Sequence, residues 1–211
     1  TETVYATLDN SGAVQNISVT DWIHTDTPEV YLRDVTDLEN ITNVKSDTEP
    51  YFKDGGLFWN MPTTDLYYRG TSNKTLPVSI SIKYYLNDEE IAASDLAGKS
   101  GKVKIRFDYT NNLKKTITVN GKSKQAYVPF TMITGMMLPN DNFSNVEVTN
   151  GKVVEAADSN VVVGITMPGL KDSLNISFDG KKADLDIPEY FEVSADVTDF
   201  SLDMTLSVAT S

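Results

Sequence analysis

Side chains that could perform chemistry are few in this chain. Its 211 residues include no cysteine and one histidine, His24. This composition removes thiol nucleophiles, thiolate metal ligands, disulfides and any site that needs two histidines. His24 follows Trp22 and Ile23 in a polar stretch that lacks the strand–turn–helix context of a nucleophilic serine. We therefore interpret it as a surface histidine, and we predict no catalytic residue.

Carboxylates are abundant, with 30 Asp and Glu residues, and they form two clusters along the chain. The clusters are Asp184, Asp186 and Glu189, then Asp196, Asp199 and Asp203. A Ca²⁺ ion needs several oxygen ligands at about 2.3–2.6 Å, usually from one tight loop. The first cluster lacks the spacing and central glycine of an EF-hand loop, and in the second Asp199 and Asp203 share an outward face. We predict solvated carboxylates at both places, with no metal and no cofactor.

The sequence partly matches the motifs of two kinds of active site, a phosphate-binding loop and a glycosidase carboxylate pair, but neither match is complete. Gly98–Lys102 resembles part of a phosphate-binding loop, but it lacks the earlier glycine and lies after a helical turn and before a strand. It is better interpreted as a tight turn with solvated lysines. Glycoside hydrolysis needs two carboxylates about 5–9.5 Å apart, and among so many acidic residues the sequence singles out no pair.

Four aromatic residues are the strongest candidates for ligand binding: Trp22, Trp59, Tyr67 and Tyr68. Flat exposed rings stack on sugar rings in many β-sandwich modules, and aromatic side chains anchor protein interfaces. Tyr67 and Tyr68 are adjacent in a predicted strand, so one of the two must face outward. The alternative is that these rings fill the core and form ordinary cross-strand pairs.

The overall charge excludes several partner classes. With 18 basic and 30 acidic side chains the net charge is −12, which argues against nucleic acid and against anionic lipid, because both require clustered Lys and Arg. No apolar run approaches the roughly 18–20 residues of a membrane span. The chain begins with Thr1 and stops soon after a strand pattern, so we expect it to be cut from a longer protein.

Alternating hydrophobic residues predict antiparallel strands along most of the chain. Apolar residues recur at every second position of 78–86 and of 103–109, which is typical of half-buried strands. Between these strands Ser94 is expected to cap one helical turn that ends before Gly98. The apolar phase shifts between Val197 and Phe200, so the chain must turn a corner there and cross between two sheets.

This pattern predicts an all-β, antiparallel fold. A polar segment, Gly70–Thr75, is the best linker in the chain. We predict a small N-terminal β-subdomain over residues 1–75 and an immunoglobulin-like β-sandwich over residues 76–211.

Several passages together resemble a known family. They are Glu2–Tyr5 leading into Leu8–Gly12, then Leu66–Thr71, Leu76–Pro77 leading into Ile82–Leu86, Asp95–Ile105, and Ala195–Phe200. They are similar to the N-terminal extracellular region of membrane proteins of Gram-positive bacteria related to the phage infection protein (YhgE/Pip) group. The resemblance spans Val4 to Thr210 and implies a β-rich region that precedes long helical segments and transmembrane helices. Its motifs carry no chemistry.

The expected function is that of a non-enzymatic extracellular module of a membrane-anchored bacterial surface protein, for adhesion, recognition or spacing. Its partner would be a protein or glycan of the cell envelope, and the membrane would be spanned by the parent protein rather than by this fragment. The alternative is a carbohydrate-binding module that uses the four aromatic residues. A third hypothesis is an enzyme that uses a pair of carboxylates.

Overall fold

The computed structural model describes residues 1–27, 31–60, 63–174, 177–178, 181–182 and 185–211. Nearly all of its regular structure is antiparallel β-strand, which confirms the all-β class predicted from the sequence. The chain divides into two compact units. Unit 1 contains residues 1–9 and 13–75, and unit 2 contains residues 10–12 and 76–211.

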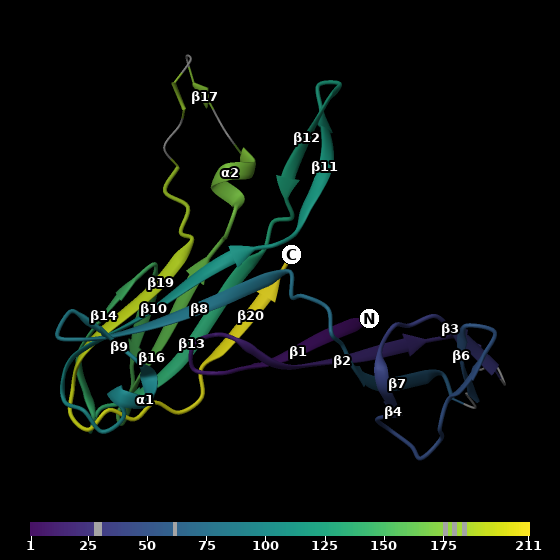
Figure 1. Cartoon of the computed structure of the whole chain (residues 1–211), viewed down its shortest axis with the longest axis horizontal. Coiled ribbons are helices and arrows are strands. Elements are labelled where there is room, and N and C mark those ends of the chain that lie inside the picture. The colour runs from purple at the N-terminus through teal and green to yellow at the C-terminus, as the bar shows by residue number, and fades with distance from the viewer. Residues whose placement is uncertain (28–30, 61–62, 175–176, 179–180, 183–184) are drawn as a thin grey trace. The chain divides into compact units, whose positions relative to one another are not determined.

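Unit 1 is built from two small antiparallel sheets (Figure 1). The larger has the order β1 (Glu2–Leu8), β2 (Val14–His24), β7 (Asp65–Thr71) and β4 (Glu39–Asn43). The smaller has the order β3 (Tyr31–Asp34), β6 (Gly56–Asn60) and β5 (Tyr51–Lys53). Their shared core contains Leu57, Trp59, Leu66 and Tyr68. Alternation along β7 therefore buries Leu66 and Tyr68 and turns Tyr67 to the other face.

Unit 2 is a sandwich-like pair of antiparallel sheets (Figure 1). One sheet has the order β14 (Phe143–Thr149), β19 (Tyr190–Val197), β10 (Gly101–Asn111), β8 (Val78–Leu86) and β9 (Glu89–Ile91). The other has the order β15 (Gly151–Glu155), β16 (Ser159–Thr166), β13 (Thr131–Pro139) and β20 (Leu206–Thr210). The remaining elements are the hairpin of β11 (Lys114–Val119) and β12 (Lys122–Tyr127), the pair β17 (Ser177–Phe178) and β18 (Lys181–Lys182), and the short helices α1 (Ala93–Leu96) and α2 (Leu170–Leu174).

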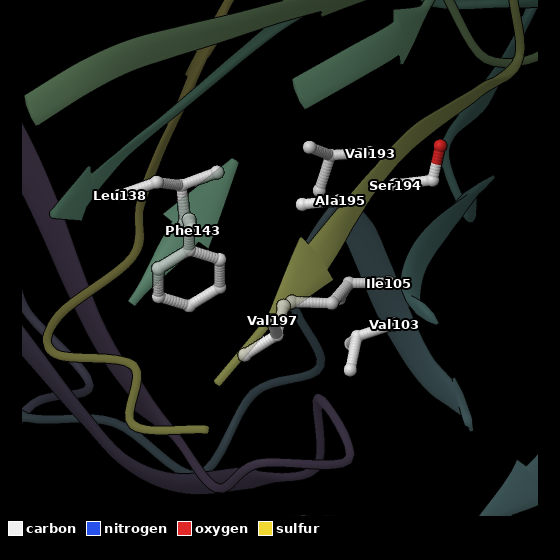
Figure 2. A pocket seen from close by; sticks show the side chains of 8 residues that line it. All are labelled: Val103, Ile105, Leu138, Phe143, Val193, Ser194, Ala195 and Val197. Carbon is white, nitrogen blue, oxygen red and sulfur yellow. The ribbon is translucent and has the colours of Figure 1, made fainter. Parts of the chain in front are cut away.

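The core of unit 2 is drawn from both sheets. Phe107 of β10 stacks on Phe191 of β19 with ring centroids 5.5 Å apart, and Phe191 is fully buried. Figure 2 shows Leu138 and Phe143 facing Ala195 and Val197 across a narrow gap, with Val103 and Ile105 nearby. This gap has a volume of about 10 Å³, which is at most the space of one water molecule. It is a packing defect in an apolar core and offers no room for a ligand.

A polar link joins the two sheets inside this core. The Tyr109 hydroxyl of β10 lies 2.5 Å from Thr134 Oγ1 of β13, and Thr134 Oγ1 lies 2.7 Å from Ser207 Oγ of β20. Burial raises the pKa of the Tyr109 phenol against the opposing effect of its hydroxyl partners. The buried hydroxyls of Tyr109 and Thr134 are thus paired, as buried polar groups require, whereas the buried Thr166 hydroxyl has no partner among the described residues.

Two local predictions have different outcomes. The corner after Val197 is confirmed, because β19 ends there in one sheet and β20 lies in the other. The predicted Ser94 cap is wrong: helix α1 begins at Ala93, its N-cap is Ala92, and no side chain caps it. Gly98 still follows the helix end in a left-handed conformation, with φ of 74°, as expected for a helix terminator.

Candidate functional site

The most distinctive surface feature is an aromatic pair on the outer face of the larger sheet of unit 1. Trp22 of β2 lies directly opposite Tyr67 of β7 in the antiparallel register. Their rings are parallel within 2°, with centroids 5.9 Å apart. Trp22 remains 40% exposed. Stacking uses one face of each ring, so the indole keeps apolar surface for contact with a ligand.

Asp65 holds this aromatic pair in place. The Trp22 indole donates its Nε1 proton to Asp65 Oδ1 at 2.8 Å, and His24 Nδ1 lies 2.9 Å from the same oxygen. The Thr64 hydroxyl donates to the other oxygen, Asp65 Oδ2, at 3.0 Å. These hydrogen bonds, that of Trp22 first, lower the pKa of the Asp65 carboxyl. We call Trp22, His24, Asp65 and Tyr67 the aromatic platform.

His24 belongs to this platform as a partner of carboxylates. Its Nε2 lies 3.5 Å from Asp26, while Nδ1 faces Asp65. The hydrogen bond to Asp65 is the main cause that raises the pKa of His24, and Asp26 adds to it. Because both ring nitrogens face carboxylates, the imidazole is not placed to accept a proton from a hydroxyl nucleophile. The geometry is that of a charged, hydrogen-bonding rim beside the rings.

Lys45 adds a positive charge to the same surface. Its Nζ lies 5.2 Å from the centroid of the Tyr67 ring, within the range of a cation–π contact. The chain runs from β4 to Lys45 beside β7, because Val44 donates its backbone N–H to the Tyr67 carbonyl. The platform and the adjacent Lys45 therefore combine apolar ring surface with a carboxylate, an imidazole and an ammonium group.

The other two predicted aromatic residues lie in the core. Trp59 is 0% exposed and Tyr68 is 1% exposed, with ring centroids 5.4 Å apart. Their interpretation as an exposed stacking surface is therefore wrong. Strand alternation explains the difference, because Tyr67 and Tyr68 are adjacent and only one can face solvent. Trp59 occupies the middle of the smaller sheet, and its Nε1 has no hydrogen-bond partner in the described part of the chain.

Tyr68 ties two carboxylates together beneath the larger sheet. Its hydroxyl lies 2.6 Å from Asp34 and 3.2 Å from Asp21. Burial and these neighbouring carboxylates raise the pKa of the Tyr68 phenol well above its usual range. The phenol therefore stays protonated and can donate to the carboxylates at any ordinary pH.

A hollow of about 400 Å³ opens beside this cluster within unit 1. Its lining residues come from β1, β2, β7 and the segments after β3 and β7: Glu2, Val19, Asp21, Val35, Thr36, Asp37, Leu38, Tyr68, Ser72 and Lys74. Lys74 forms an ion pair with Asp37, which lowers the pKa of Asp37 and raises that of Lys74. The remaining carboxylates give the hollow an acidic lining, which disfavours anionic ligands.

The acidic clusters near the C-terminus do not assemble into a metal site in the described part of the chain. Across that part, no three His, Asp or Glu side chains converge on a common point. Asp196 accepts a hydrogen bond from Asn145 at 2.7 Å, and the Asp199 backbone N–H bonds to Ser100 Oγ. Asp184 of the first cluster lies outside the described residues.

Gly98–Lys102 has a structural role that accounts for its composition. The Gly98 backbone N–H donates to the Phe200 carbonyl, and the Phe200 N–H donates to the Lys99 carbonyl. With the Ser100 contact to Asp199, these bonds join the turn before β10 to the crossover after β19. The segment anchors two loops of the sandwich to each other.

Sequence reasoning found two of the four platform residues. It named Trp22 and Tyr67, and it treated His24 as a solitary surface histidine. The partnership of His24 with Asp65 spans 41 residues, and only the pairing of β2 with β7 brings the two side chains together. Of the residues that line the acidic hollow, sequence reasoning singled out only Tyr68 as a candidate for ligand binding.

Comparisons with known proteins add no identity. Neither a protein-family model nor a curated protein sequence matches this chain. Among the residues that the structure describes, no helix has the length and apolar character needed to cross a membrane.

Proposed function

We propose that the chain is a non-enzymatic recognition module from the extracellular part of a membrane-anchored bacterial surface protein. The single observation that carries the recognition role is the aromatic platform, in which an exposed indole is held by Asp65 beside a stacked tyrosine. The cell-surface setting rests on the sequence resemblance to envelope proteins related to the phage infection protein group. Adhesion and spacing are compatible variants of this role.

Rigid presentation is the physical argument for binding at the platform. A large aromatic ring left in water carries unfavourable apolar exposure, and such rings are concentrated at interaction sites. Here the Nε1 hydrogen bond and the Tyr67 ring restrict the Trp22 side chain before any ligand arrives. Ordering a side chain on binding costs about 0.5–1.5 kcal/mol, so this restriction favours affinity.

A carbohydrate is the ligand class that the platform fits best, and a glycan-binding module is the second form of the proposal. A sugar ring presents C–H groups to an aromatic face and hydroxyl groups at its edge. At the platform, Trp22 and Tyr67 supply the aromatic surface, while the Asp65 carboxylate supplies an acceptor and the adjacent Lys45 ammonium supplies donors. A protein ligand would use the same rings as an anchor.

Tryptophan fluorescence gives a direct test, because the chain has two tryptophans and only Trp22 is exposed. Glycans of the bacterial cell wall and an array of diverse oligosaccharides are titrated into the full chain. We expect a change in emission that disappears in Trp22→Phe, and affinity at least about tenfold weaker, or about 1.4 kcal/mol, in Tyr67→Ala. Tyr31→Ala, which removes an exposed ring of β3, is the matched control.

The outcomes separate the two forms of the proposal. Glycan binding that depends on Trp22 and Tyr67 supports the carbohydrate form. Blank glycan assays combined with platform-dependent binding to an envelope protein support the protein-recognition form. Binding that Trp22→Ala and Tyr67→Ala leave unchanged would exclude the platform as the site.

The immunoglobulin-like topology and the absence of cofactor and nucleic acid remain predictions.

A further inference from the structure

The two outer faces of the unit 2 sandwich have opposite chemical character. On the sheet that contains β10, Arg106 pairs with Asp108 at 2.9 Å and with Glu192 at 3.6 Å, and its guanidinium lies 3.9 Å from the Tyr190 ring centroid. Such a network of charged side chains is typical of a sheet face in contact with water. Among the residues that the structure describes, the outer face of the sheet that contains β13 has no comparable network of ion pairs.

That second face is apolar along three adjacent rows of the register. One row is Val208, Ile133 and Ile165, the next is Leu206, Gly135, Val163 and Lys152, and the third is Met137, Val161 and Val154. We call these residues the apolar face. Lys152, at one edge, is the only charged side chain in the three rows.

The exposure of the apolar face is large for a solvated surface. Met137 is 60% exposed and Leu206 is 59% exposed, and Ile133, Val154, Ile165 and Val208 are exposed by two-fifths or more. These six side chains are neighbours in the register and form one contiguous apolar patch, and large patches of this kind mark interaction sites. A standard interface buries about 800 Å² on each partner, and burial of these six exposed side chains would contribute a large part of that area.

The shape and charge of the face also suit a second copy of the same chain. Gly135 lacks a side chain, and an added Cβ there would meet only the Val162 carbonyl oxygen at 3.9 Å, so a side chain of another copy has room to approach the backbone between its neighbours on the face. A face that carries both exposed side chains and such an open position can complement itself about a two-fold axis. Because the three rows contain no carboxylate, and their one lysine, Lys152, lies at the edge, two chains of net charge −12 can meet there without opposing carboxylates.

We infer that the chain forms a symmetric dimer in which the apolar face of one copy packs against the apolar face of the other. Two sheets pack face to face at about 10 Å with their side chains interdigitated. This geometry would bury the exposed valine, leucine, isoleucine and methionine side chains of both copies. The inference stands on unit 2 alone and does not depend on ligand binding at the aromatic platform.

Sedimentation velocity of the full chain over a wide concentration range tests this dimer. We expect a reversible monomer–dimer equilibrium that Met137→Glu and Leu206→Glu each weaken at least about tenfold, because each change places like charges within the interface of both copies. Val119→Glu is the matched control, since Val119 lies in the β11–β12 hairpin and is 46% exposed, close to the 49% of Val208. Far-ultraviolet circular dichroism checks that each variant retains its strands.

Methionine-methyl NMR supplies a second readout that does not require a substitution. The Met137 methyl signal is expected to shift with protein concentration, whereas the signals of the buried Met132 and Met136 shift less. A wild-type chain that remains monomeric at all concentrations overturns the inference. A dimer that survives both Met137→Glu and Leu206→Glu, or that Val119→Glu weakens equally, also overturns the inference. If the chain is monomeric and its apolar face instead binds a membrane or another protein, the face has a different occupant and the dimer is excluded.

Discussion

The Trp22 indole and the Asp65 carboxylate are joined by a 2.8 Å hydrogen bond between neighbouring strands of unit 1. Asp65 Oδ1 also faces His24, so one carboxylate oxygen orients both an aromatic ring and a titratable ring. The exposed indole is therefore linked to the protonation of its neighbour. Because of this link, the state of the aromatic platform can be followed by Trp22 fluorescence and by its dependence on pH, without knowing the ligand.

The first prediction concerns the pKa of His24. The hydrogen bond and charge of Asp65 raise this pKa above the usual value of about 6.5. Asp65→Asn removes the charge while keeping a carbonyl acceptor for Trp22, so we expect the pKa of His24 to fall toward its usual value. An NMR pH titration reads it without ambiguity, because the chain has one histidine. An unchanged pKa in Asp65→Asn would contradict the pairing, and Asp54→Asn, in the turn between β5 and β6 of the smaller sheet, is the control.

A second prediction is the pH window in which the platform is best ordered. The pKa of His24 is raised, so its contribution is fully present below about pH 6.5 and is lost as the pH rises through the raised value. The pKa of Asp65 is lowered, so its contribution is present above its usual value of about 3.9 and is lost as the pH falls through the lowered value. The platform should be most rigid in mildly acidic solution. Fluorescence anisotropy of Trp22, measured in a Trp59→Phe background, should peak there and lose this peak in His24→Gln.

A third prediction concerns the hydroxyl of Tyr68. Tyr68→Phe leaves the Asp34 and Asp21 carboxylates without the donor that now lies 2.6 Å and 3.2 Å away. We expect the free energy of unfolding of unit 1 to fall by about 1–3 kcal/mol. Tyr67→Phe is the matched control, since it removes the hydroxyl of the adjacent, outward-facing tyrosine. Urea denaturation followed by Trp59 fluorescence reports on unit 1 specifically, and equal effects of the two substitutions would refute the assignment.

Local sequence pattern predicted the strands of unit 2 well. Val78 and Tyr84 are buried in β8, and Ile80, Ile82 and Leu86 pack against the same core, as their alternation indicated. The phase change between Val197 and Phe200 correctly located the crossover between sheets. These features were predictable because the alternation of side chains is a property of one strand and its immediate neighbours in sequence.

The candidate site was only half predictable, for a reason that lies in long-range pairing. Alternation showed that either Tyr67 or Tyr68 faces outward, but the choice depends on which face of β7 meets Trp59 and Leu57 of the smaller sheet. The apolar face of unit 2 could not be predicted for the same reason, because Ile133, Ile165 and Val208 become neighbours only through the register of three strands. Pairing across tens of residues is not contained in a local pattern.

The last prediction tests packing in the core of unit 2 with two glycines of neighbouring strands. A Cβ added at Gly164 would lie 2.3 Å from ring atoms of Phe191. That ring cannot move aside, because it is fully buried and stacked on Phe107. We expect Gly164→Ala to lower the free energy of unfolding of unit 2 by about 1–3 kcal/mol through overpacking.

Gly135→Ala is the control for this test, because its Cβ would meet only one atom, at 3.9 Å, and a surface change of this kind stays within about 0.5 kcal/mol. Thermal unfolding followed by circular dichroism, at a concentration low enough to keep the chain monomeric, compares the two variants. If Gly164→Ala is as stable as Gly135→Ala, then Phe191 is not confined as the structure places it. The double substitution Gly164→Ala with Phe191→Leu should recover part of the loss, since the smaller side chain makes room for the added methyl group and the two effects are therefore not additive.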